Sequence, residues 1–190
     1  MSNKQPKRCS WAGTDPVMQA YHDSEWGVPL HDDQRLFEFL VLEGAQAGLS
    51  WSTVLNKRDA YRKAFHGFEI ARVARMSDTA LDKLLQNPAV IRNRLKIHSA
   101  RNNARAALAV VNELGSLDAY FWSFVAGKPI RNRWRERGDV PARTELSDRL
   151  SKDLKKRGFN FVGSTIVYAH MQATGMVNDH FTGCFRYREV

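Results

Sequence analysis

The chain has few cysteines, no long apolar run and a shortage of negative charge. Two cysteines among 190 residues cannot form a disulfide framework, so the sequence indicates a reducing compartment and we expect a cytoplasmic protein. No apolar stretch approaches the roughly 20 residues that a membrane helix needs, and the basic start of the chain has no apolar core behind it. We therefore expect neither a membrane anchor nor a secretory signal.

Positive charge is the most unusual feature of the composition. Lysine and arginine total 29 against 20 aspartate and glutamate residues, which gives a net charge of +9. An excess of this size predicts a polyanionic partner. Because no basic stretch also carries a wide apolar face, nucleic acid is favoured over a membrane surface. The apolar share of 43% and the charged share of 26% exclude disordered and collagen-like chains.

Helical periodicity dominates the chain, whereas no alternating run typical of a strand exceeds a few residues. Apolar spacing, caps and glycine stops predict helices over 33–42, 50–65, 93–114, 117–125, 146–157 and 164–174, with a short helix from Ser77 to about Pro88. The fold class is therefore all-α, and residues 1–190 are expected to form a single domain. The basic segment (127–144), with two prolines, two glycines and six lysines or arginines, is predicted to be an exposed loop.

Both cysteines lie near the ends of the chain, and each has a histidine nearby. Cys9 and His22 are 13 residues apart, and His180 and Cys184 are 4 apart. Two such pairs could form a closed tetrahedral site whose metal ion is structural and joins the two ends. The alternative is two buried free cysteines and two unrelated histidines. Spacing alone leaves both interpretations open.

Glu43 is the only charged residue between positions 39 and 55. A carboxylate in an apolar run reaches solvent, has a partner or faces a site. Small residues surround it, and a helix stop at Gly48 would place Leu49 and Trp51 at the mouth of the resulting space. Such a space suits a planar, hydrogen-bonding ligand such as a nucleobase. The alternative is a helix-terminal glutamate in water, with Trp51 in the core. More aromatic surface lies close to the N-terminus, at Trp11, Tyr21 and Trp26.

A glycine turn joins the last two predicted helices. One helix ends at Gly158, and Gly163, Ser164 and Thr165 open the next. Free backbone N–H groups at a helix start can bind a phosphate, and three basic residues precede the turn at 155–157. The alternative is an ordinary pair of helices with a solvated charged face.

Taken together, these segments resemble 3-methyladenine DNA glycosylase I, the constitutive alkylation-repair enzyme of bacteria. The matching runs span nearly the whole chain and lie at 9–11, 15–29, 36–51, 89–97, 121–125, 154–180 and Cys184. The resemblance implies an all-α fold of the helix-hairpin-helix glycosylase superfamily, with a base pocket between two helical lobes. It also implies one structural zinc ion that joins residues 1–30 to 175–190. Its ligands fall on the two Cys–His pairs, Cys9, His22, His180 and Cys184.

The resemblance also assigns roles around the pocket and on the DNA-binding face. The base-recognition carboxylate falls on Glu43, with Tyr21, Trp51 and Trp11 as base-binding neighbours. The loop that fills the gap in the duplex falls on Gly48 and Leu49. The hairpin falls on Lys155 to Thr165, with Gly163, Ser164 and Thr165 as its DNA-binding residues. The basic segment shows no matching pattern, so the resemblance implies no role for it.

The implied reaction is hydrolysis of one N-glycosidic bond. A monomer would flip 3-methyladenine out of double-stranded DNA, read its edge with an ionised Glu43, and leave free base and an abasic site. Related helix-hairpin-helix glycosylases carry an aspartate that aids bond cleavage where this chain has Asn178. No lysine follows Lys156, so the Schiff-base lysine of a lyase is missing and no lyase activity is expected. Two other functions would share the metal and the charge: a DNA-binding protein that recognises damage without cleavage, and an RNA-binding or RNA-modifying protein.

Overall fold

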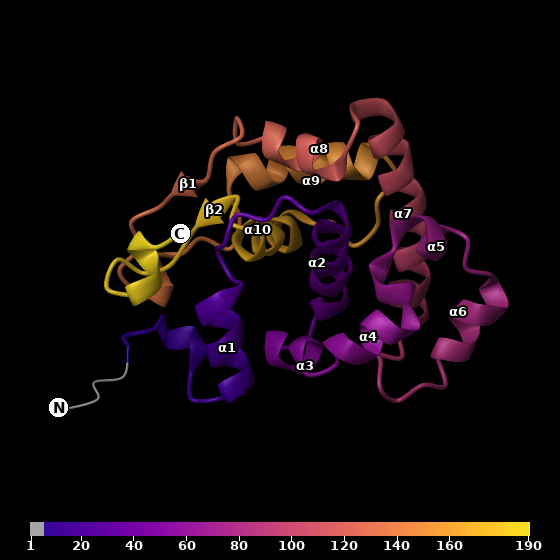
Figure 1. Cartoon of the computed structure of the whole chain (residues 1–190), viewed down its shortest axis with the longest axis horizontal. Helices are drawn as coiled ribbons and strands as arrows, with labels where there is room; N and C mark the ends of the chain where they lie inside the picture. Colours follow the sequence, from indigo (N-terminus) through magenta and orange to yellow (C-terminus); the bar gives the residue numbers. More distant parts are fainter. Residues whose placement is uncertain (1–5) are drawn as a thin grey trace.

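Helices make up most of the computed structural model, which describes residues 6–190 (Figure 1). The α-helices are α1 (Pro16–Ser24), α2 (Asp33–Gln46), α3 (Trp51–Leu55), α4 (Arg58–Ala64), α5 (Ile70–Ala74), α6 (Asp78–Leu84), α7 (Arg94–Leu114), α8 (Leu117–Ser123), α9 (Glu145–Lys156) and α10 (Ser164–Ala173). Short 3-10 turns are η1 (Ser10–Ala12), η2 (His66–Phe68), η3 (Arg137–Asp139) and η4 (Phe185–Arg188). Across this described range, no helix is both long enough and apolar enough to cross a bilayer.

Side-chain caps fix where most helices begin. Asp15 accepts hydrogen bonds from the backbone at the start of α1, and Asp32 does the same for α2. Ser50 caps α3 through Thr53 N, and Asn93 caps α7 through Lys96 N. Each cap satisfies a backbone donor that has no partner inside its helix, and is worth about 1 kcal/mol. The helix starts predicted near 33, 77, 93 and 117 are confirmed.

Three helical predictions need correction. The helix expected over 50–65 is two helices, because the chain tightens into i→i+3 bonds at Lys57, whose N–H donates to Val54 O. The helix predicted over 33–42 continues to Gln46, close to the stop expected at Gly48, and Gly44 lets the turn after α9 approach it: a Cβ there would lie 3.1 Å from Phe161 Cβ. Helices α1 and α5 were not predicted, because each has too few apolar positions for a clear period.

Helix α2 lies at the centre of the fold. Its residues from Leu36 to Ala45 are all buried, and α7, α8 and α10 pack around it (Figure 1). A helix that is apolar on every side is stable only when other elements cover it fully. Each of its buried leucine and phenylalanine side chains contributes about 1.5–3 kcal/mol relative to exposure. Glu43 is therefore carried into the interior by the most firmly packed element of the fold.

The basic segment is largely exposed, as predicted, but it is not a free loop. Within it, β1 (Ile130–Arg131) pairs in parallel with β2 (Val177–Asn178), the only sheet among residues 6–190. Ile130 N donates to Met176 O at 2.9 Å, and Asn132 N donates to Asn178 O at 3.1 Å. This pairing fixes the segment against the C-terminal part of the chain. Strands of two residues leave no alternating pattern for sequence reasoning to find.

Candidate functional site

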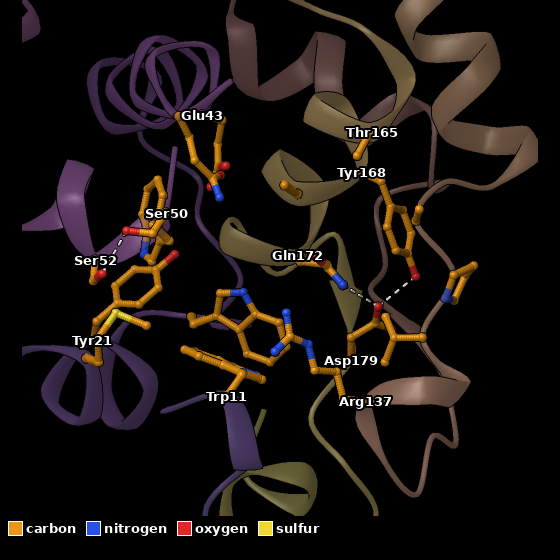
Figure 2. A pocket seen from close by; sticks show the side chains of 18 of the residues that line it. Trp11, Tyr21, Glu43, Ser50, Ser52, Arg137, Thr165, Tyr168, Gln172 and Asp179 are labelled. Carbon is orange, nitrogen blue, oxygen red and sulfur yellow. Dashed lines mark hydrogen bonds between the residues drawn. The ribbon is translucent and has the colours of Figure 1, made fainter. Parts of the chain in front are cut away.

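A cavity of about 580 Å³ opens between α1, the α2–α3 turn, α10 and the basic segment (Figure 2). Its lining includes the four residues predicted to bind a base, namely Trp11, Tyr21, Glu43 and Trp51, together with Leu49 from the predicted gap-filling loop. It also includes Thr165, from the start of α10. Segments that are distant in the sequence therefore meet at one concave site, as the predictions required.

Glu43 projects from α2 into this cavity (Figure 2) and is only 4% exposed. Burial disfavours its charged form and raises the pKa of the carboxyl to about 8. At pH 7 the free protein therefore keeps most Glu43 side chains protonated. A cationic ligand would restore the charge, because an opposite charge nearby favours the ionised form.

Aromatic rings line the wall beside Glu43. The Tyr21 ring lies 5.4 Å from that of Trp51 and 6.4 Å from that of Trp11, in tilted arrangements, and Tyr21 is 3% exposed. Burial raises the pKa of its hydroxyl well above the usual value, so Tyr21 stays a neutral donor. The indole N–H of Trp51 is buried and has no hydrogen-bond partner among the described residues. The cavity thus offers stacking surfaces, a carboxyl and a free donor, which together suit a planar base.

Asp179 is a lining residue that sequence reasoning missed. It is 1% exposed, and its carboxylate accepts from Tyr168 Oη at 2.6 Å and Gln172 Nε2 at 2.8 Å (Figure 2). Asn132 Nδ2 and Trp134 Nε1 donate to its other oxygen at 2.6 and 2.8 Å. The sequence could have indicated it, because Asp179 is the only carboxylate between positions 158 and 184, just as Glu43 is the only charged residue between 39 and 55.

The neighbouring Asn178 faces away from the cavity. Its side-chain amide donates to Tyr187 O and Val190 O, and its oxygen accepts from His180 N. Asn178 thus fastens the C-terminal turn, whereas the following residue, Asp179, reaches the cavity.

The turn after α2 lies at the mouth of the cavity. Gly48 has a φ of +77°, a conformation that favours glycine, and Leu49 is 42% exposed. Lys96 Nζ donates to Ala45 O at 2.8 Å and to Ala47 O at 2.5 Å. The last carbonyls of α2 are thereby tied to α7, and the exposed leucine stands on a braced turn.

The turn between α9 and α10 presents a free helix start, as predicted. Gly163 precedes α10 without any side-chain cap, and no atom lies within 4 Å of where its Cβ would be. Ser164 Oγ lies 2.8 Å from Ser147 Oγ, which ties this start to α9. Thr165 faces the cavity. The open backbone of Gly163 therefore lies next to the pocket.

The four predicted metal ligands meet in one buried cluster. One ligand atom from each of Cys9, His22, His180 and Cys184 lies within 4.8 Å of all the others. His180 Nδ1 is 3.6 Å from Cys9 Sγ and 3.7 Å from Cys184 Sγ, and His22 Nε2 is 3.4 Å from Cys184 Sγ. The Cys9 thiol, then His180 and His22, hold the pKa of Cys184 far below its usual value. This arrangement is compatible with a metal ion.

Outer contacts orient both histidines of the cluster. His22 Nδ1 bonds to Asp23 Oδ1 at 2.8 Å, and His180 Nε2 bonds to Trp26 O at 3.0 Å. The ring nitrogens on the other side of each imidazole are thereby directed toward the sulfurs, the orientation that metal-binding histidines adopt. The cluster brings the two ends of the described chain together, and Phe185 N also donates to Lys7 O at 2.9 Å. Residues 1–5, part of the predicted N-terminal tie, lie outside the described range.

Comparisons with known proteins give consistent matches. A model of the methyladenine glycosylase family matches residues 11–187. The chain is 48% identical to DNA-3-methyladenine glycosylase 1 of Escherichia coli, over 95% of this chain and 97% of that protein. It is also 48% identical to DNA-3-methyladenine glycosylase of Haemophilus influenzae, over 93% and 96%.

Solved structures give the same result for the fold. A crystal structure of 3-methyladenine DNA glycosylase I superposes with a TM-score of 0.92 at 51% identity, covering 94% of this chain and 98% of the other. The enzyme from Staphylococcus aureus, described with the structural basis of its 3-methyladenine recognition, gives 0.91 at 37% identity, covering 94% and 95%.

Proposed function

The chain belongs to the methyladenine glycosylase family, and we propose that it excises 3-methyladenine from alkylated double-stranded DNA. The observation that carries this function is Glu43, buried beside Tyr21 and Trp51 in a cavity large enough for a base. The relatives named above are glycosylases for the same base, and a solved variant of 3-methyladenine DNA glycosylase I is described in complex with 3-methyladenine. The reaction leaves an abasic site and belongs to base excision repair.

Recognition rests on the charge of the lesion. A base methylated at N3 is cationic while it is still attached to the sugar, whereas normal adenine is neutral. The flipped cation stacks between Tyr21, Trp51 and Trp11, and its exocyclic amine donates to Glu43. Binding shifts Glu43 from its protonated to its ionised form, and the released proton passes to solvent. Normal adenine brings no charge to offset this ionisation, so the pocket discriminates against it.

Bond cleavage needs little acid catalysis, because the methylated base departs as a neutral molecule. The electron pair of the C1′–N9 bond goes to the base, a water molecule adds at C1′, and the proton of that water is lost to solvent. Asp179 has its oxygens occupied by four donors and is poorly placed to remove that proton. It instead adds negative charge to the wall near which positive charge develops on the sugar.

We infer that DNA docks on the face that carries the two turns. The start of α10 at Gly163 offers uncapped backbone N–H groups for a phosphate, with Ser164 and Thr165 beside it. Leu49, exposed on its braced turn, fills the gap that the extruded nucleotide leaves in the stack. The phosphate contact at Gly163 would make the connection between α9 and α10 a helix-hairpin-helix element.

We infer that the ion at the buried cluster is zinc. Zn–S and Zn–N bonds of about 2.3 and 2.0–2.1 Å place tetrahedral sulfur and nitrogen ligands about 3.6 Å apart. Three of the sulfur–nitrogen distances, those from His180 to Cys9 and Cys184 and from His22 to Cys184, lie between 3.4 and 3.7 Å. A site closed by four protein ligands supplies stability rather than chemistry, so Cys9, His22, His180 and Cys184 would hold the ends of a monomer together.

Chromatography of the bases released from methylated duplex DNA tests the function, with the zinc content measured on the same sample. We expect free 3-methyladenine, an unbroken strand until alkaline treatment, and one zinc ion per chain. A protein that binds methylated DNA but releases no base would be a damage-binding protein, and the proposed function would be wrong. Preferential binding of structured RNA would point to the RNA-directed alternative.

A further inference from the structure

Among residues 6–190, Arg137 is the only basic residue in the lining of the cavity. It stands on η3 in the basic segment, and its side chain extends toward the pocket (Figure 2). Arg143 of the same segment pairs with Asp148 at 3.5 Å, whereas Arg137 pairs with no carboxylate of the described residues. A cation without a partner therefore faces a pocket that is built to receive a cationic base.

The turn that carries Arg137 is held rigidly. Trp134 Nε1 donates to Asp179 at 2.8 Å, and Trp134 O accepts from Thr182 N at 2.8 Å. Asp139 closes the turn, because its carboxylate accepts from the backbone N–H groups of Arg135 and Glu136 at 2.8 and 3.1 Å. The backbone that carries the exposed Arg137 side chain is therefore fixed at the cavity before any ligand arrives, which reduces the entropy lost on binding.

The charges of the lining explain what this guanidinium would bind. Glu43 lies on the wall formed by α2, where the base enters, and Asp179 lies with its donors on the opposite side (Figure 2). An arginine with no anion would oppose a cationic base, so its presence requires an anion that enters together with that base. A flipped nucleotide brings such an anion, since a phosphodiester flanks it on each side. The planar guanidinium suits bidentate binding of phosphate oxygens.

We propose that Arg137 binds a phosphodiester next to the flipped nucleotide, and that the basic segment is a second DNA-contacting wall opposite the α9–α10 turn. This inference rests on the proposed function. It assigns a role to the part of the chain for which the sequence resemblance gave none.

The test pairs one protein variant with a neutral DNA linkage. Duplexes carry a stable abasic analogue, and a single methylphosphonate replaces the phosphate on its 5′ or its 3′ side. Arg137→Gln removes the cation, and Arg133→Gln, exposed on the same segment but outside the cavity lining, is the matched control. The binding constant of each protein for each duplex is measured as a function of salt concentration.

We expect wild type and the Arg133 variant to lose about tenfold in affinity at one of the two neutral linkages, in line with one charge-assisted contact. Arg137→Gln should bind the duplex with normal phosphates about tenfold more weakly than wild type does, and it should lose no further affinity when that linkage is neutral. The slope of its log binding constant against log salt concentration should become shallower by about 0.9. Its affinity for free 3-methyladenine, followed by tryptophan fluorescence, should be unchanged, because a free base carries no phosphate.

Additive losses at both linkages would overturn the inference. Loss of free-base binding in Arg137→Gln would also overturn it, because the residue would then serve the base rather than the backbone. These binding measurements need no excision. A wild-type protein that shows the coupling but releases no base would therefore contradict the proposed function and leave the phosphate site standing.

Discussion

Replacing Glu43 with glutamine should lower activity and raise stability at the same pH. A carboxylate about 4 Å from a cationic base, at an effective dielectric constant of about 20, is worth about 4 kcal/mol. This corresponds to about a thousandfold in kcat/KM, and we expect that loss for Glu43→Gln near pH 9. At pH 7 ionising the wild-type carboxyl from a pKa of about 8 costs about 1.4 kcal/mol, so the loss should shrink to about a hundredfold.

The same pKa predicts the change in stability. The carboxyl titrates near its usual value of 4.5 in the unfolded chain and at about 8 in the folded protein. Its folded pKa is raised, so its stabilising contribution is full below pH 4.5 and is lost as pH rises through 8. At pH 7 burial of Glu43 thus costs about 3 kcal/mol that glutamine would not, and the variant should melt roughly 10 °C higher. At pH 4.5 the two proteins should melt at nearly the same temperature.

Two assays carry this prediction. Release of 3-methyladenine from methylated DNA, measured from pH 6 to 9, should rise about tenfold per unit for wild type up to about pH 8 and stay flat for Glu43→Gln. Thermal unfolding over the same range supplies the stability comparison. A variant that excises at the wild-type rate would show that Glu43 is not the recognition carboxylate. A variant that melts lower than wild type at pH 7 would show that burying this carboxyl does not cost stability.

Three further perturbations follow from contacts described above. Lys96→Met removes the hydrogen bonds that brace the turn after α2, so excision from duplex DNA should fall about tenfold while the affinity for free base is unchanged. Lys57→Met is the control: it removes a 2.8 Å hydrogen bond to the backbone carbonyl of Pro88 and should change neither quantity. Asp179→Asn leaves about two buried donors without acceptors and should lower the free energy of unfolding, measured in urea, by about 2–6 kcal/mol. A decrease below about 1 kcal/mol would contradict the four-donor arrangement. Removal of the metal by a chelator should lower the melting temperature on the order of 10 °C, and an apoprotein that melts like the holoprotein would rule out a structural ion.

Features that are local in the sequence could be predicted well. Asn93 and Ser77 are caps whose chemistry acts within one helical turn, so the helix starts beside them were found. Glu43 could be found because an isolated carboxylate in an apolar run has few explanations. The two Cys–His pairs pointed to a metal site, although spacing could not show that the pairs meet.

Features that depend on contacts between distant segments could not be predicted in this way. The residues around Gly44 do not show that Phe161, far along the chain, packs against it. Arg137 belongs to the cavity only because Trp134 is bound to Asp179, a contact across 45 residues. No pattern in the basic segment itself records that contact.

The ligands of the metal cluster alternate with lining residues along the same two short stretches. Cys9 is followed by Trp11, and His180 stands between Asp179 and Phe181. A substitution that reshapes this side of the pocket therefore also disturbs the tie between the chain ends. Descendants of this protein that acquire a different lesion preference should carry their changes on the α2–α3 turn, which lines the cavity but contributes no residue to the metal cluster.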